Sequence, residues 1–251
     1  MPDAVNHTVS AASDEPNAKR QKMEAKKFLK DLPADEFICV MNECLEGSRV
    51  IISVDGVEHS LPKKIVCSTS SFFDRAFNGN FKEGNEQKME LKDVKKKPFY
   101  LAVQWMFTGQ IVLPTACDGS AEIITELIGF LELADRLDIM GPFDSIIGTM
   151  RSKMHSNRNA LLPQHIRDVA KLPRNHPARA LIAIACVGPY ASAVKNPDTF
   201  GFKAELEEVE GFASDLFKAF GSTLRLFKSY TSVTIVDPLT SVTVEIDSDH
   251  F

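Results

Sequence analysis

The chain has 251 residues, of which 44% are hydrophobic and 25% charged, and its formal net charge is −5. These values are typical of a globular chain, and they exclude wholesale disorder, a collagen-like repeat and a dedicated nucleic-acid coat, which would be basic. The longest unbroken apolar run, Ala180–Val187, has eight residues. A membrane-spanning helix needs about 20, so we expect no membrane segment. The N-terminus also lacks the apolar core of a secretory signal, which predicts an intracellular location, in the nucleus or the cytoplasm.

The first 27 residues are rich in Ala, Ser, Asn, Lys and Glu and show no apolar periodicity. This composition predicts a disordered basic tail over residues 1–27. Within it, Lys19, Arg20 and Lys22 form a short basic cluster of the kind that acts as a nuclear-import signal. Two interpretations stay open, because the same cluster could serve only to keep the tail solvated.

A lead-in at residues 28–46 mixes apolar and acidic positions and predicts a short helix or an irregular segment. A β-hairpin is predicted directly after it. Residues 50–54 (VIISV) are β-branched, Asp55-Gly56 is a strong turn signal, and residues 57–61 can pair back as the second arm.

The pattern then changes to a helical period. Ser71 followed by Asp74 predicts a capping box at a helix start. Phe73 and Phe77 are four positions apart, as the buried face of a helix requires. Residues 89–91 (MEL) predict a short third strand.

Three further helices and one strand are predicted before residue 155. Pro98 is suited to the first position of a helix that ends at Gly109. Residues 110–114 (QIVLP) predict a strand. Residues 120–139 are apolar almost all round, which predicts a central helix, and residues 143–154 start another.

The second half of the chain is predicted to be helical and then strand-prone. Helices are expected at 163–171, 177–187 and 205–229. Residues 231–247 alternate on either side of Asp237-Pro238, as a β-hairpin would. No Lys or Arg follows residue 228, so this tail is acidic.

Cysteines, histidines and sequence motifs indicate no catalytic or metal chemistry. An odd, scattered set of cysteines in a chain this long does not predict a disulfide framework, and the six histidines are dispersed. We therefore expect reduced core thiols, no metal and no cofactor. The motifs GxSxG, GxxxxGK[ST], HExxH and GxGxxG are absent, so we expect no enzyme. The cysteines are Cys39, Cys44, Cys67, Cys117 and Cys186.

Residues 50–140 resemble the BTB/POZ domain, a protein-interaction fold. The matching runs are VIISVDG, IVCSTSSFFDRAFNGNFKEG, MELKDV, FYLAVQWMFTGQI and LIGFLELADRLDI. The Cys-Ser-x-Ser-x-Phe-Phe motif together with WMFTG is most similar to the BTB/POZ domains abundant in filamentous fungi. The hallmark positions of the family are Ser70, Phe73, Phe77, Phe81, Glu83, Leu91, Phe99, Gly109, Leu133, Ala134 and Asp135.

The resemblance implies an α+β fold in which a small β-sheet is capped by a cluster of α-helices. We expect this BTB/POZ domain over residues 36–150, a helical C-terminal extension over 151–230 and a strand-prone acidic tail over 231–251. Most hallmarks have core roles in this picture. Phe73 would anchor the first helix pair, and Gly109 would end a helix where a positive φ is needed.

The function implied is non-catalytic protein binding that mediates homo- or hetero-oligomerisation. Apolar residues in the lead-in exceed what a lone surface helix would expose. They would cover either the domain's own core or a twofold mate in a homodimer. These residues are Phe28, Leu29, Phe37, Ile38, Val40, Met41 and Leu45.

Two narrower functions remain as alternatives. The first is a substrate adaptor for a cullin-based E3 ubiquitin ligase, because Phe81-Lys82-Glu83 matches the hydrophobic-x-Glu motif with which family adaptors bind the cullin scaffold. Phe81 would enter a pocket on the cullin and Glu83 would take a charged or amide partner, unless Phe81 simply packs within its own domain. The second is a nuclear transcriptional regulator that acts through partners, since no zinc finger or basic helix predicts direct nucleic-acid binding.

Overall fold

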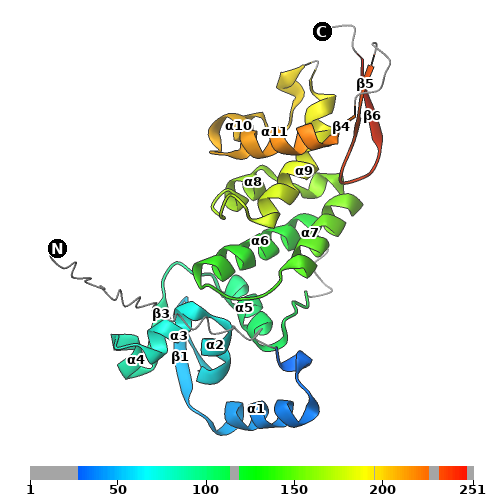
Figure 1. Ribbon diagram of the computed structural model, residues 1–251. Helices are drawn as coiled ribbons and strands as arrows, with labels where there is room; N and C mark the ends of the chain where they lie inside the picture. Colours follow the sequence, from blue (N-terminus) through cyan, green and yellow to red (C-terminus); the bar gives the residue numbers. More distant parts are fainter. Residues whose placement is uncertain (1–27, 114–118, 195, 226–231, 248–251) are drawn as a thin grey trace, which may run out of the picture.

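The computed structural model describes residues 28–113, 119–194, 196–225 and 232–247 (Figure 1). The predictions for residues 1–27, including Lys19, Arg20 and Lys22, lie outside the described residues, as does Cys117. In this part of the chain no helix is both long and apolar enough to cross a bilayer.

A three-stranded sheet with the order β2-β1-β3 lies in the N-terminal half. It consists of β1 (Arg49–Val54), β2 (Val57–Pro62) and β3 (Lys88–Leu91). The predicted hairpin is confirmed, since β1 and β2 pair antiparallel around Asp55 and Gly56, whose φ angles are 51° and 74°. The third strand is also confirmed, and it runs parallel to β1.

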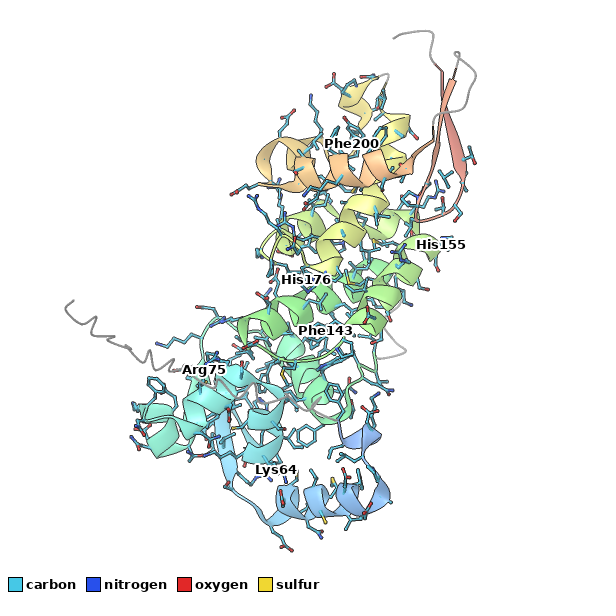
Figure 2. All side chains as sticks on the ribbon, in the orientation of Figure 1. Lys64, Arg75, Phe143, His155, His176 and Phe200 are labelled. Atoms are coloured by element: carbon cyan, nitrogen blue, oxygen red, sulfur yellow. The ribbon has the colours of Figure 1, made fainter. Side chains whose placement is uncertain are left out.

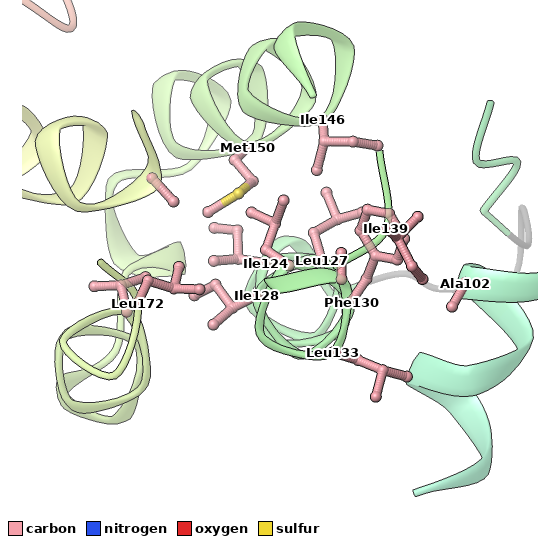
Figure 3. Packing of buried hydrophobic residues seen from close by; sticks show 14 of the residues in the cluster. Ala102, Ile124, Leu127, Ile128, Phe130, Leu133, Ile139, Ile146, Met150 and Leu172 are labelled. Atoms are coloured by element: carbon pink, nitrogen blue, oxygen red, sulfur yellow. The ribbon is translucent and has the colours of Figure 1, made fainter. Parts of the chain in front are cut away.

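Helices cover this sheet and continue into a stacked extension (Figure 1). The predicted central helix is confirmed as α6, which has buried side chains on nearly every side. Figure 3 shows Ile124 and Ile128 of α6 packed near Met150 and Leu172, with Ala102 on a different side of the helix. The helices of this half are η1 (Leu29–Asp31), α1 (Ala34–Glu46), α2 (Lys63–Thr69), α3 (Ser71–Asn78), α4 (Lys82–Glu86), α5 (Lys96–Thr108), α6 (Ser120–Arg136) and α7 (Asp144–Ser156).

The C-terminal half adds two helix pairs and a second small sheet. The sheet has the order β4-β5-β6. Its antiparallel strands β5 and β6 confirm the hairpin predicted for residues 231–247, and the short strand β4, which precedes the hairpin in the chain, pairs with β5. Figure 2 places His155 of α7 beside this hairpin, and its Nδ1 lies 3.3 Å from the carbonyl oxygen of Leu239. The elements are η2 (Arg158–Ala160), α8 (Pro163–Val169), α9 (Pro177–Ser192), η3 (Pro197–Thr199), α10 (Lys203–Glu208), α11 (Phe212–Thr223), β4 (Leu224–Arg225), β5 (Ser232–Val236) and β6 (Thr243–Asp247).

Two predicted elements are wrong. The helix expected over 205–229 is two helices, α10 and α11, because the chain becomes extended at Val209 (φ −89°, ψ 113°) and then turns at Gly211, whose φ is +83°. The strand expected over 110–114 is not formed in its described part, residues 110–113. There the N–H of Val112 donates to the side-chain oxygen of Gln104 (2.8 Å).

Two predicted helix starts are displaced. The N-cap of α3 is Ser70, whose hydroxyl oxygen accepts a hydrogen bond from the N–H of Phe73 (3.1 Å), so the expected capping role of Ser71 is wrong. Pro98 is the third residue of α5 rather than its first. Both helices therefore begin earlier than the local residue preferences suggest, although the faces that they bury are the expected ones.

Candidate functional site

Phe81 and Glu83 lie together on the short connection between α3 and β3. Phe81 is the N-cap residue of α4, and its side chain is 60% exposed. Glu83 lies in the first turn of α4 and is half-buried. The structure thus brings an exposed aromatic ring and a carboxylate onto one surface segment, two positions apart.

Close packing of the backbone shapes this connection. A Cβ at Gly84 would lie 2.3 Å from the carbonyl oxygen of Gly79, so only glycine allows α4 to approach the end of α3 in this way. The ammonium group of Lys63 donates a hydrogen bond to the carbonyl oxygen of Phe77 (3.0 Å) and satisfies a free acceptor at the end of α3. Sequence reasoning missed both residues, because their roles depend on contacts between separate elements.

A second exposed apolar surface is formed by α1, which lies at the far end of the molecule in Figure 1. Its Ile38 and Leu45 side chains are 56% and 71% exposed. Other lead-in residues cover the chain's own core, among them Phe28, whose ring meets that of Trp105 edge-on with 5.7 Å between centroids. One part of the lead-in therefore packs against the core of its own domain, and another part is an exposed apolar helix face.

The segment 110–113 extends the exposed apolar surface of this half. Val112 is 70% exposed, while Ile111 and Leu113 pack partly against the core. Gly109, which ends α5 with a φ of +64°, joins this segment to α5. A Cβ at Gly109 would lie 2.6 Å from the ring of Phe28, so the lead-in passes directly over the start of the segment.

The other hallmark positions mostly build the core. The Ser70 hydroxyl donates to the carbonyl oxygen of Leu137 (2.6 Å) and ties the start of α3 to the end of α6. Phe73 and Phe77 stack with 5.9 Å between their ring centroids. Asp135 differs from these, because it is exposed at the end of α6. The buried hallmarks are Ser70, Phe73, Phe77, Leu91, Phe99, Leu133 and Ala134.

A cleft with a volume of about 760 Å³ lies between the start of α5, the outer face of α6 and α8. Lysines and carboxylates both line it. Within it, Lys171 pairs with Asp168 (2.6 Å) and with Glu132 (3.5 Å). Burial raises the pKa of the Glu132 carboxyl, and the nearby Lys171 partly opposes this rise. The lining of this cleft thus carries charges of both signs, and Lys171 pairs with two of the carboxylates.

No arrangement in the described part of the chain resembles a catalytic centre. Its residues include no group of three His, Cys, Asp or Glu side chains placed to hold a metal ion. The described cysteines are free thiols, and burial raises the pKa of Cys186 to about 12. A thiol that stays protonated at neutral pH is a poor nucleophile. The exposed surfaces of α1, 110–113 and the Phe81–Glu83 segment therefore remain the candidate functional sites.

Comparison with known proteins gives a family match over part of the chain. Residues 41–153 match the family model of the BTB/POZ domain. The curated protein "Kelch repeat and BTB domain-containing protein 4" from Homo sapiens, Mus musculus and Pongo abelii is 34% identical to this chain over 77 residues. That segment is 30% of this chain and spans only 14–15% of the length of these relatives.

Proposed function

Because residues 41–153 form a BTB/POZ domain, we propose that this chain is a non-catalytic protein–protein interaction module that assembles homo- or hetero-oligomers. The BTB/POZ fold is an interaction fold rather than a catalytic one. The observation that carries self-association is the uncovered apolar side chains of Ile38, Leu45 and Val112, each more than half exposed. Burial of these side chains against a partner would remove their apolar surface from water, which is favourable.

The division of the chain is part of this proposal. We assign the interaction fold to residues 36–150 and a supporting helical extension to 151–230, with tails at 1–27 and 231–251. The CSTSSFF and WMFTG wording also supports placing the chain with the BTB proteins of filamentous fungi.

Light scattering tests the self-association. At micromolar concentration the chain should show about twice its monomer mass of 27.8 kDa. The double variant Ile38→Glu/Leu45→Glu should be monomeric, because two carboxylates would be buried without partners in the dimer. Phe217→Glu is the matched control, since Phe217 is 77% exposed but lies on α11. A wild-type chain that stays at the monomer mass would contradict the proposal.

A second candidate is a substrate adaptor of a cullin-based ubiquitin ligase. It is supported by Phe81, because an aromatic ring whose role is to pack in its own core would be buried, whereas this one is 60% exposed. The carboxylate of Glu83 lies on the same segment. Relatives that combine a BTB domain with Kelch repeats are consistent with such a role.

Binding to a purified cullin N-terminal domain tests the adaptor role. Phe81→Ala and Glu83→Ala should each weaken binding strongly, since the first removes an apolar anchor and the second its neighbouring charge. Tyr100→Ala is the control, because it removes another aromatic ring, 49% exposed, from α5. Equal binding by the wild type and the Phe81→Ala/Glu83→Ala variant would rule the role out.

A third candidate is a nuclear regulator that acts through protein partners. It is supported only by the basic cluster of Lys19, Arg20 and Lys22. A fluorescent fusion that lacks residues 1–27 should lose nuclear accumulation. The idea fails if this fusion distributes between nucleus and cytoplasm as the full-length fusion does.

A further inference from the structure

Gln87 has an unusual backbone conformation at the end of α4. Its φ and ψ angles are 51° and 34°, in the left-handed region. A residue other than glycine, asparagine or aspartate is uncommon there, because its Cβ crowds the backbone. Gln87 also has a buried side-chain oxygen, Oε1, without a hydrogen-bond partner among the described residues. Both features cost free energy, so the glutamine side chain must contribute something that glycine could not.

The contribution is a pair of hydrogen bonds from its amide nitrogen. Nε2 donates to the carbonyl oxygen of Phe77 (3.1 Å), near the end of α3, and also to that of Gly84 inside α4. The backbone carbonyl of Gln87 accepts a hydrogen bond from the N–H of Ile51 in β1 (2.9 Å). One residue therefore connects the last turn of α3, the short helix α4 and the central strand of the sheet.

The segment between these anchors holds Phe81 and Glu83. Helix α4 has only five residues, which is too short to be stable through its own hydrogen bonds. Its first turn is closed by the N–H of Asn85, which donates to the carbonyl oxygen of Phe81 (3.2 Å). The conformation that exposes Phe81 beside Glu83 must therefore be held from outside α4.

We propose that Gln87 is a positioning residue, which holds the Phe81–Glu86 segment in its binding conformation before any partner arrives. The inference about binding rests on the proposed adaptor function, whereas the inference about the segment does not. When the segment is already ordered, binding of a partner does not include the free-energy cost of ordering it. Gln87 would thus raise affinity without touching the partner.

Gln87→Met is the main test variant. Methionine has nearly the same length and shape and experiences the same crowding at positive φ, but it has no N–H donors. If the competent fraction of the segment falls to about one tenth, the apparent Kd for a purified cullin N-terminal domain rises about tenfold. Hydrogen exchange should also become faster at the amides of residues 82–86 and stay unchanged in α6, whether or not a cullin is present.

A second variant separates positioning from stability. Gln87→Gly removes the crowding as well as the amide, so it should be at least as stable as Gln87→Met toward urea and yet lose the same affinity. Ile124→Val, a core change in α6 at a fully buried position, should lower the urea midpoint and leave the Kd unchanged. If the loss of affinity for the cullin domain correlates with the loss of stability toward urea across these three variants, the positioning role is overturned.

The two proposals fail in different ways. If the amides of residues 82–86 exchange in Gln87→Met at the same rates as in the wild type, the inference about Gln87 is overturned. A Kd within twofold of the wild-type value also overturns it, provided that Phe81→Ala abolishes binding. A wild-type chain that does not bind the cullin domain overturns the adaptor function instead, and the exchange rates then decide the role of Gln87.

Discussion

The BTB/POZ region and the helical extension bury different kinds of side chain. Among the described residues of the matched region, 41–153, the buried polar side chains are the hydroxyls of Thr69 and Ser70. The extension and the hairpin after it bury an imidazole, a guanidinium and two carboxylates. These belong to His165, Arg179, Glu205 and Asp237.

Ion pairs join the two helix pairs of the extension. The guanidinium of Arg179 on α9 donates from Nε and Nη2 to one carboxylate oxygen of Asp215 on α11 (2.9 and 2.8 Å). Its Nη1 donates to the carbonyl oxygens of Ala170 and Leu172 at the end of α8. Arg167 on α8 bridges two carboxylates of α10.

Short helices contribute to the difference between the two regions. Helices α8 and α10 have seven and six residues, and such short helices bury little apolar area. The 17-residue helix α6 buries eight side chains. The matched region therefore depends on apolar burial, which is nearly insensitive to pH, whereas the extension combines apolar burial with buried charged and titratable side chains.

The largest expected effect is on the apolar core of the matched region. Phe73→Ala removes a fully buried ring that stacks on Phe77. We expect unfolding to become easier by about 3–5 kcal/mol, through lost burial and the cavity left behind. Urea unfolding followed by tryptophan fluorescence reports on it, because Trp105 lies in the same core. A loss below about 1 kcal/mol would mean that this core is not the main source of stability.

Much of this region could be predicted from the sequence because its signals are local. Asp55-Gly56 alone predicts the hairpin turn, and the apolar periodicity of residues 120–139 predicts α6 as a central helix. The segment 110–113 shows the limit of such signals. Its β-branched residues suit a strand, yet the side chain of Gln104 takes the N–H of Val112 that a neighbouring strand would have bound.

The extension and the candidate site were less predictable for a physical reason. The apolar period of residues 205–229 continues across Gly211, so periodicity alone does not show where the chain leaves the helix. Phe81 and Glu83 could be found through a family motif. Gln87 could not, because its hydrogen bonds reach three separate elements and no spacing in the sequence indicates them.

The second prediction tests whether the buried ion pair of Arg179 and Asp215 stabilises the extension. Arg179→Met keeps most of the apolar stem but leaves Asp215 and two backbone carbonyls without their donor. Removing one partner of a largely buried pair costs about 3 kcal/mol. The double variant Arg179→Met/Asp215→Leu should recover part of this loss in urea unfolding. If the double variant is no more stable than the single one, an unpaired carboxylate is not the cause.

The third prediction concerns pH and is smaller. His165 is fully buried; its Nδ1 accepts the N–H of Leu162 (3.1 Å), and its Nε2 lies 2.8 Å from the hydroxyl of Thr125 on α6. Burial lowers the pKa of this imidazole, and Asp168 only partly opposes the effect. Well above pH 6.5 the imidazole is neutral in both the folded and the unfolded state, and its contribution to stability is fully present. As the pH falls from 6.5 toward the lowered pKa, the unfolded state takes up protons first and stability is lost.

Comparing the wild type with His165→Gln isolates this contribution. The urea midpoint of the wild type should fall more steeply between about pH 7.5 and pH 5 than that of the variant. His176, whose pKa is also lowered by burial, acts in the same direction in both proteins. The raised pKa of Glu132 acts in the opposite direction above pH 4.5. Parallel profiles for the two proteins would show that His165 does not make the extension sensitive to pH.

The smallest expected effect comes from an ion pair of the same type at the surface. Arg174 and Glu210 join the same two layers as Arg179 and Asp215, at 3.0 Å, but their side chains are 76% and 91% exposed. Water solvates both charges whether or not they pair, so Arg174→Ala should cost less than about 0.5 kcal/mol in urea unfolding. Raising the salt concentration should remove even this difference. A cost for Arg174→Ala equal to that of Arg179→Met would show that pairing across the layers, rather than burial of the charge, stabilises the extension.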